Sequence, residues 1–354
     1  MSPSMTIIIP THNRQVQLLQ TLNSLANQTS NPESFEVIVV ADGCKDSTSV
    51  KVRKLSTPYR LTLIEQPPSG AASARNRGAN FASTHILIFL DDDIDPKPDL
   101  VRSHLEAHEK WPEGVILGNF PIAEEEGRRS LFESGNRVWW SKYFAEIGRD
   151  AYRFTLFDLC AGNFSINCDL FKDIGGFDEN FLVCEDTELG FRLHKRGIKF
   201  HFARNALAYH HANVNQQRLL RRRVEEGKAH VLLVKKHKTA EIAAALPLGY
   251  AIDIKQKWQK SKYKSDLPEN FLQLIWSNPI LAKYLISCLQ FPLYVSRKFR
   301  IYPLYYKILG LTYNYYYWCG VRDEIGSLSS LQNLIHDSQA EPKNFKEVEI
   351  DLEK

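Results

Sequence analysis

Short apolar runs alternate with helix-like segments over the first 122 residues. Four runs have the length and the β-branched content of buried strands, at residues 6–9, 35–40, 61–64 and 86–90. Residues 15–27 between them repeat apolar side chains every three or four positions, and residues 71–81 are rich in Ala and Arg. Strands that alternate with helices predict an α/β fold with a mainly parallel central sheet.

A second ordered segment follows residue 160. A helix is predicted to begin at Glu185-Asp186 and to end at Gly197, and alternating apolar residues from Ile198 to Phe202 predict a strand. Residues 124–158 show neither period and are predicted to be irregular. Their many aromatic side chains fill a core or line an acceptor pocket, and the core is the favoured interpretation.

Composition excludes several classes of protein. The chain has 354 residues, 44% hydrophobic and 24% charged, which is typical of globular proteins and excludes disordered and collagenous chains. Its six cysteines form no CxxC pair, so zinc fingers and disulfide frameworks are excluded and free thiols in a reducing compartment are expected. The N-terminal apolar run is too short for a signal peptide, so a cytoplasmic location is expected.

Charge divides the chain unevenly. Residues 201–310 hold 19 Lys and Arg against 6 Asp and Glu, with basic clusters at 221–223, 235–238 and 255–264. Aromatic residues crowd the following 291–318, which together with the basic excess favours contact with an anionic membrane surface. The alternative is a helical region that only packs on the rest of the protein. The most apolar stretch, 271–296, is interrupted by Lys283 and Pro292 and therefore fails as a membrane span.

Polar residues follow three of the predicted strands, and the carboxyl ends of parallel strands share one edge of a sheet. They are Thr11-His12-Asn13, Asp42-Gly43 and Asp91-Asp92-Asp93. Three adjacent carboxylates in a DXD pattern need a cation, and their hard oxygens suit Mg²⁺ or Mn²⁺ shared with a substrate phosphate. A calcium loop and an acidic surface turn remain alternatives.

Six motifs stand in order along residues 5–235. They are Ile7-Ile-Ile-Pro-Thr-His-Asn-Arg14, Val39-Val-Ala-Asp-Gly43, Gly70-Ala-Ala-Ser-Ala-Arg-Asn-Arg-Gly78, Leu90-Asp-Asp-Asp-Ile94, Gly162-Asn163, and Gly175-Gly-Phe-Asp-Glu179 through Glu185-Asp186. This ordered set resembles the family 2 glycosyltransferases, inverting nucleotide-sugar enzymes of the GT-A fold. The resemblance implies a GT-A domain at 1–235, followed by a helical basic and aromatic region at 236–338 and an acidic polar tail at 339–354.

The resemblance also implies a donor site. The residues expected to bind the nucleotide sugar are Pro10, Thr11, Asn13, Arg14, Asp42, Arg75, Asn76, Asp91, Asp92, Gly162, Asn163 and Glu185. Asp42 would hydrogen-bond the base, although Asp-Gly is also an ordinary tight turn. Arg75 would lie near the nucleotide, although it could equally be paired with nearby acids. Asp92 should point away from its two neighbours if the strand alternation continues.

By the same resemblance, Asp91 contacts ribose or metal, Asp93 binds the metal and Asp186 is the general base that takes the acceptor hydroxyl proton. An Asp at a helix start also has a structural explanation, as a cap or as a partner of the helix dipole. His210 is the expected third metal ligand, in preference to His211, because neighbours in an extended chain face opposite ways.

The implied function is inverting transfer of a sugar from a nucleotide-diphosphate donor, with a UDP-sugar favoured, to a hydroxyl acceptor of a lipid-linked, polysaccharide or protein chain. No nucleic-acid partner is expected. A non-catalytic nucleotide-binding or membrane scaffold remains an alternative. A sugar nucleotidyltransferase is a weaker one, because Pro-Thr-His-Asn-Arg replaces the glycine-rich loop that such enzymes carry after the first strand. The missing GxGxxG argues against a dehydrogenase.

Overall fold

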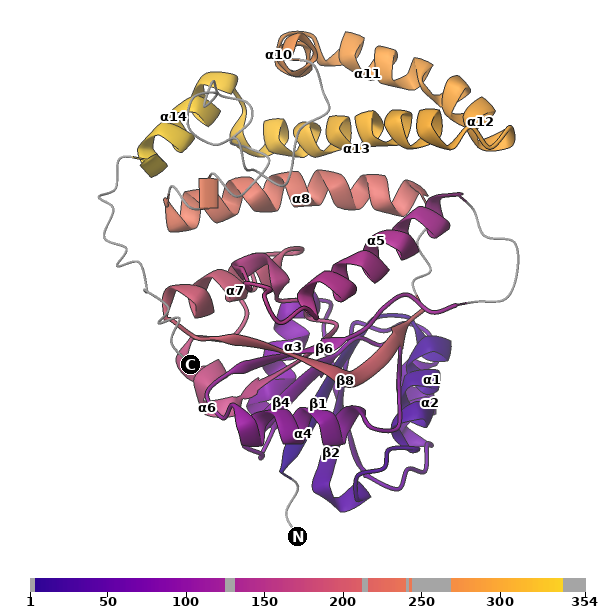
Figure 1. Cartoon of the computed structure of the whole chain (residues 1–354), viewed down its shortest axis with the longest axis vertical. Helices are drawn as coiled ribbons and strands as arrows, with labels where there is room; N and C mark the ends of the chain where they lie inside the picture. The colour runs from indigo at the N-terminus through magenta and orange to yellow at the C-terminus, as the bar shows by residue number, and fades with distance from the viewer. Residues whose placement is uncertain (1–3, 125–130, 212–215, 240–241, 244–268, 340–354) are drawn as a thin grey trace. The chain divides into compact units, whose positions relative to one another are not determined.

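The computed structural model describes residues 4–124, 131–211, 216–239, 242–243 and 269–339 (Figure 1). The chain divides into two compact units, Met1–Gln216 and Gln217–Lys354. This division falls earlier than the boundary expected at residue 235. The basic cluster at 255–264 and all but the first residue of the 339–354 tail lie outside the described residues.

The first unit is built on an eight-stranded sheet of order β3-β2-β1-β4-β7-β6-β8-β5. Its strands are β1 (Met5–Thr11), β2 (Phe35–Asp42), β3 (Arg60–Gln66), β4 (Ile86–Leu90), β5 (Ile94–Pro96), β6 (Val115–Asn119), β7 (Asn163–Asn167) and β8 (Phe200–His210). The β3-β2-β1-β4 half is parallel, whereas β7 is antiparallel to both its neighbours and β5 is antiparallel to β8. All four strands predicted in the first 122 residues are confirmed.

Helices cover both faces of this sheet because its strands are apolar on both sides. The helices are α1 (Gln15–Leu25), α2 (Thr48–Arg53), α3 (Ala71–Phe81), α4 (Leu100–Lys110), α5 (Leu131–Ile147), α6 (Cys168–Asp173) and α7 (Glu185–Lys195). Ile7 of β1 belongs to the core with α1, α2, α4 and α5, while the adjacent Ile8 belongs to the core with α3, α6 and α7. The α/β prediction is therefore confirmed.

The prediction of an irregular stretch at 124–158 is wrong, because α5 occupies Leu131–Ile147. Trp140, Tyr143, Phe144 and Ile147 recur at helical spacing, and all four belong to or pack against the core under α1 and α4. The helical period was missed in the sequence because aromatic residues also occupy positions outside this set. The core interpretation of these side chains is confirmed, although Trp139 is 55% exposed.

The second unit is helical. Its helices are α8 (Gln216–His237), α10 (Glu269–Ser277), α11 (Pro279–Cys288), α12 (Gln290–Lys298), α13 (Tyr302–Ile325) and α14 (Leu328–Gln339) (Figure 1). The first residue of α8, Gln216, is the last residue of the first unit. The backbones of α8 and α13 meet at two glycines: a Cβ on Gly227 would lie 2.1 Å from the Tyr317 carbonyl, and one on Gly320 would lie 1.9 Å from that of Val224. In the part of the chain that the structure describes, every helix is too short or too polar to cross a bilayer.

Candidate active site

The candidate site lies where the strand order of the first unit reverses. β1 is flanked by β2 on one side and β4 on the other, and in open α/β sheets ligands bind beyond the carboxyl ends of the strands where the order reverses in this way. The residues at these ends are Thr11 to Arg14 after β1 and Asp91 to Asp93 after β4. The topology therefore brings the first and fourth motifs to one place.

The three aspartates after β4 have different partners. Asp91 pairs with Arg75 at 2.7 Å, whereas Arg14 Nη1 bridges Asp92 at 2.7 Å and Asp93 at 2.8 Å. Thr11 Oγ1 also donates to Asp92, and burial raises the pKa of this carboxyl to about 6. The expected alternation, with Asp92 pointing away from both neighbours, is wrong. β4 ends at Leu90, so these residues form a turn, where the two-residue period no longer applies.

Arg75 joins the DXD segment to the start of α7. Its guanidinium is 4% exposed and donates to Asp91 at 2.7 Å and to Glu185 at 2.8 Å, while its Nε has no hydrogen-bond partner among the described residues. Burial and the neighbouring Asp186 charge raise the pKa of Glu185, against the opposing effect of Arg75. The alternative that Arg75 is paired with acids therefore holds, and those acids are themselves predicted site residues.

Asp186 occupies the first turn of α7, but it is not the helix cap. The N-cap is Cys184, whose backbone lies in the left-handed region with φ 62°. Nothing in the sequence predicted this conformation. Asp186 Oδ1 accepts from the Thr187 N–H at 2.8 Å, and Oδ2 accepts from the Ala161 N–H at 3.3 Å. Since each carboxylate oxygen has two lone pairs, each retains one for a further donor. The Asp186 side chain is half-buried. Its two hydrogen bonds orient the carboxylate and still leave it able to accept others.

His210 ends β8 and lies against Asp93, with Nε2 3.3 Å from Oδ1. The donor types of Asp91, Asp93 and His210 fit a hard or borderline divalent cation, and the Nδ1 atom of His210 is buried without a partner among the described residues. No set of three or more acidic, His or Cys side chains in the described ranges is arranged as a ready metal cluster. Arg14 and Arg75 instead neutralise the carboxylates.

Residues expected around the nucleoside make contacts that shape the loops. Asn13, at φ 52°, accepts from the N–H groups of Lys45 and Asp46 through Oδ1. The Asp42 carboxylate accepts from Gln66 Nε2 and from the N–H groups of Ser69 and Gly70. These bonds draw the loops after β1, β2 and β3 together. Pro10 is buried within β1.

Two further predicted residues have clear structural partners. The Asn76 side chain accepts from the Phe177 N–H at 2.9 Å and donates to the Phe177 carbonyl at 2.8 Å, which anchors the start of the sixth motif on α3. Gly162 accepts from the Asp91 N–H, and a Cβ at this position would lie 3.1 Å from Asp91 Oδ2. Gly162 thus allows the close approach of Asp91, whereas the Asn76 side chain makes its hydrogen bonds with Phe177 and Glu179.

Asn163 is fully buried, so the structure does not bring it to an open face. Its Nδ2 donates to the Ala206 carbonyl, and its Oδ1 lies 3.0 Å from His104 Nε2. Ser165 Oγ lies 2.8 Å from both His104 Nδ1 and His108 Nε2. Sequence reasoning missed this network, although His104 and His108 stand four residues apart, one helical turn.

We expect these two histidines to make the first unit less stable below neutral pH. Burial lowers the pKa of both His104 and His108 to about 4, whereas an unfolded histidine titrates near 6.5. The unfolded chain therefore takes up protons first, and stability is lost as pH falls from about 6.5 to about 4. In urea unfolding, His108→Gln should reduce the loss between about pH 7.5 and 5.5 by about 1 kcal/mol. The exposed His85→Gln is the control, and an unchanged loss in His108→Gln would contradict the prediction.

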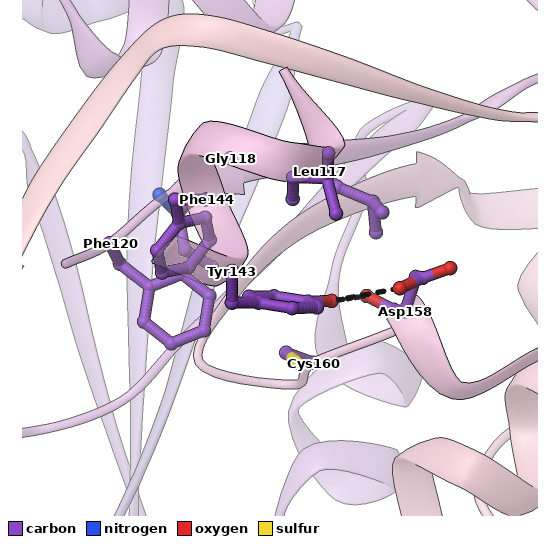
Figure 2. A pocket seen from close by; sticks show the side chains of 9 residues that line it. Leu117, Gly118, Phe120, Tyr143, Phe144, Asp158 and Cys160 are labelled. Atoms are coloured by element: carbon purple, nitrogen blue, oxygen red, sulfur yellow. Dashed lines mark hydrogen bonds between the residues drawn. The ribbon is translucent and has the colours of Figure 1, made fainter. Parts of the chain in front are cut away.

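A small pocket lies beneath α5, beside the segment that precedes β7 (Figure 2). Its lining is Leu117, Gly118, Phe120, Tyr143, Phe144, Ile147, Asp158, Cys160 and Asn163. The Tyr143 hydroxyl donates to Asp158 across it, and Asp158 closes a capping box with Thr155. The pocket has no room for a water molecule as it stands. It is therefore part of the packed core rather than an open acceptor site.

The comparison with protein families agrees with this arrangement. Residues 6–175 match the model of "Glycosyl transferase family 2". Residues 6–175 thus correspond to a family 2 glycosyltransferase domain. Validoxylamine A glucosyltransferase of Streptomyces hygroscopicus subsp. limoneus is 35% identical over 229 residues, which cover 58% of this chain and 51% of that protein. Chondroitin synthase of Escherichia coli is 27% identical, covering 58% of this chain and 34% of its own. The chain spans about half the length of the first of these relatives.

Solved structures share the fold of this glycosyltransferase domain and helical region. The crystal structure of S. aureus TarS residues 1–349 has a TM-score of 0.52 and 18% identity, with 92% of each chain covered. The mannosyltransferase PcManGT of Pyrobaculum calidifontis, in complex with GDP-Man and Mn²⁺, has a TM-score of 0.56 and 15% identity, with 91% of this chain and 87% of that chain covered. The predicted GT-A fold is confirmed.

Proposed function

We propose that this protein is an inverting glycosyltransferase, which moves a sugar from a nucleotide-diphosphate donor to a hydroxyl acceptor. One observation carries the proposal: the buried Arg75 guanidinium joins Asp91 of the DXD segment to Glu185, the neighbour of Asp186. The donor-binding acids and the base thereby belong to one site. The relatives named glucosyltransferase and synthase, and TarS structures with UDP and with UDP-GlcNAc, support a nucleotide-sugar donor.

In this proposal Asp186 accepts the proton of the acceptor hydroxyl as its oxygen attacks the anomeric carbon and the nucleoside diphosphate leaves. The N–H groups of Ala161 and Thr187 hold the carboxylate in one orientation, and its remaining lone pairs are left for the acceptor hydroxyl. A single displacement of this kind inverts the anomeric centre. The acceptor proposed for this reaction is a lipid-linked or polysaccharide hydroxyl.

A divalent cation, Mn²⁺ or Mg²⁺, would be held by Asp91, Asp93 and His210 in the same proposal. Bound there, it would neutralise the negative charge of the donor diphosphate. Arg14 and Arg75 currently supply positive charge to these carboxylates, and Arg14 also contacts Asp92. The hydrogen bond with His210 and the charge of Arg14 lower the pKa of Asp93, against the effect of burial, and so keep this carboxylate ionised.

A screen of UDP-, GDP- and dTDP-sugars tests both the function and the metal. One donor should raise the melting temperature with Mn²⁺ and release its nucleotide when an acceptor is present, and chelation should abolish both effects. Asp93→Asn should weaken donor binding about tenfold or more with Mn²⁺ while the fold is kept. Unchanged metal dependence in this variant would remove Asp93 from the site. Binding without transfer for any acceptor would favour the non-catalytic scaffold, and release of pyrophosphate would favour a nucleotidyltransferase.

A further inference from the structure

The second unit exposes apolar side chains on the helices before α13 and on the first turns of α13. Their exposed fractions run from 40% for Tyr306 to 82% for Ile280. The set, called the α11–α13 surface below, is Ile280, Leu281, Tyr284, Leu285, Phe291, Tyr294, Phe299, Ile301, Tyr302, Leu304 and Tyr306. Single exposed apolar residues are ordinary, but eleven within 27 consecutive residues require an explanation.

The helices that carry this surface are apolar on two opposite faces. In α11, Ala282 and Ile286 are buried one turn apart, while Ile280 and Tyr284 are exposed one turn apart. Positions two residues apart in a helix point in nearly opposite directions, so the exposed set lies away from the buried set. α12 repeats the pattern, with Leu293 buried and Phe291 75% exposed. A helix that is apolar all round has a second apolar partner.

The charges around the surface indicate the nature of that partner. Residues 270–322 contain six Lys or Arg and no Asp or Glu. Five of these bases, Lys283, Arg297, Lys298, Arg300 and Lys307, are exposed on the same helices or on the turn between α12 and α13. Apolar side chains that insert among lipid tails, flanked by bases that meet anionic headgroups, are typical of a helix lying in a bilayer interface.

A second copy of the chain fits this surface poorly. A two-fold interface would set the same patch against itself and so bring bases against bases. Because no acid lies within 270–322, no ion pair within this segment would relieve the repulsion. Among the aromatic residues that crowd 291–318, Tyr302 and Tyr306 belong to this surface, whereas Tyr305, Tyr315 and Tyr317 are buried in the helical unit and do not.

We propose that the α11–α13 surface docks the protein on an anionic lipid bilayer. The proposal names the residues through which the peripheral membrane association expected from the sequence would occur. It depends only on the exposure and charge of residues of the second unit. The proposal is independent of the donor site, because lipid binding is measured without donor or acceptor. Its failure would leave the transferase proposal intact, and the reverse also holds.

Vesicle sedimentation with the full chain tests the proposal. Binding to phosphatidylcholine vesicles containing about one third phosphatidylserine should fall steeply between about 0.05 M and 0.5 M salt and should be weak on phosphatidylcholine alone. Phe299→Ser should reduce the affinity about tenfold. Phe81→Ser is the control and should leave the affinity unchanged, because Phe81 is similarly exposed but lies on α3 of the first unit. Lys298→Gln with Lys307→Gln should reduce it about 25-fold at low salt, and Lys51→Gln with Lys54→Gln, the same charge change in the first unit, should have little effect.

Three outcomes would overturn the proposal. The first is that wild-type protein stays in solution when mixed with anionic vesicles at low salt, a result that needs no variant to interpret. The second is that the Phe299 and Phe81 variants, or the two lysine-pair variants, bind equally. The third is that sedimentation velocity shows a dimer that Phe299→Ser dissociates, with no lipid binding by the wild type, which would assign the surface to a second copy.

Discussion

Asp186→Asn is expected to lower sugar transfer by about 100-fold or more while donor binding stays within about twofold of wild type. In the proposed mechanism the base acts only on the acceptor hydroxyl, so its loss would affect the transition state and leave the ground-state complex with the donor almost unchanged. An amide oxygen can still accept from the Thr187 or Ala161 N–H, so the start of α7 keeps most of its support. Calorimetry with donor and Mn²⁺, together with a transfer assay, checks the two halves of this expectation.

The control is Asp169→Asn, which changes another aspartate in the first turn of a helix, α6. Both variants lose a charge that is favourable near a helix N-terminus, worth about 0.3–1 kcal/mol, so both should melt slightly below wild type. Only Asp186→Asn should lose transfer. Full activity in the folded Asp186 variant, or a product that retains the anomeric configuration, would refute the role of Asp186 as the base.

Strands β1 to β4 could be predicted because their signal is local. β4 (Ile86–Leu90) is an uninterrupted apolar run that ends at a carboxylate, and its bounds are those expected. α3 (Ala71–Phe81) likewise has the expected bounds, because Gly70 at φ 93° and the extended Ala82 limit it on both sides. α5 was missed because a segment rich in Trp, Tyr and Phe satisfies no single pattern until the face that it buries is known.

Residues for a candidate site could be proposed from the sequence, but their partners could not. Motif order indicated Asp91, Arg75 and Glu185 separately, whereas their meeting depends on how α3, β4 and α7 pack in three dimensions. The same limit explains Asn163, whose sequence neighbours indicate a site and whose buried contacts with His104 and Ala206 indicate a structural role. The left-handed Cys184 has no local signal, because cysteine has no preference for that conformation.

Arg75→Met is expected to destabilise the first unit by about 3–5 kcal/mol, the largest stability effect that its ion pairs predict. The substitution leaves Asp91 and Glu185 without their shared cation, and the Glu185 side chain is only 12% exposed. Urea unfolding measures the loss. Arg77→Met, an exposed arginine on the same helix, is the matched control and should cost less than about 0.5 kcal/mol.

Adding Glu185→Gln to Arg75→Met distinguishes two causes of the lost stability, the uncompensated charge of Glu185 and the lost packing of Arg75. If the cost of Arg75→Met comes from the uncompensated Glu185 charge, the neutral amide should restore part of it, and the double variant should be about 1–3 kcal/mol more stable than an additive sum predicts. Arg75→Lys should lie between wild type and Arg75→Met, since an ammonium keeps the charge but lacks the planar fork that reaches two carboxylates at once. Additive losses in the double variant would mean that Arg75 acts through its volume, and the electrostatic link between the DXD segment and α7 would have to be abandoned.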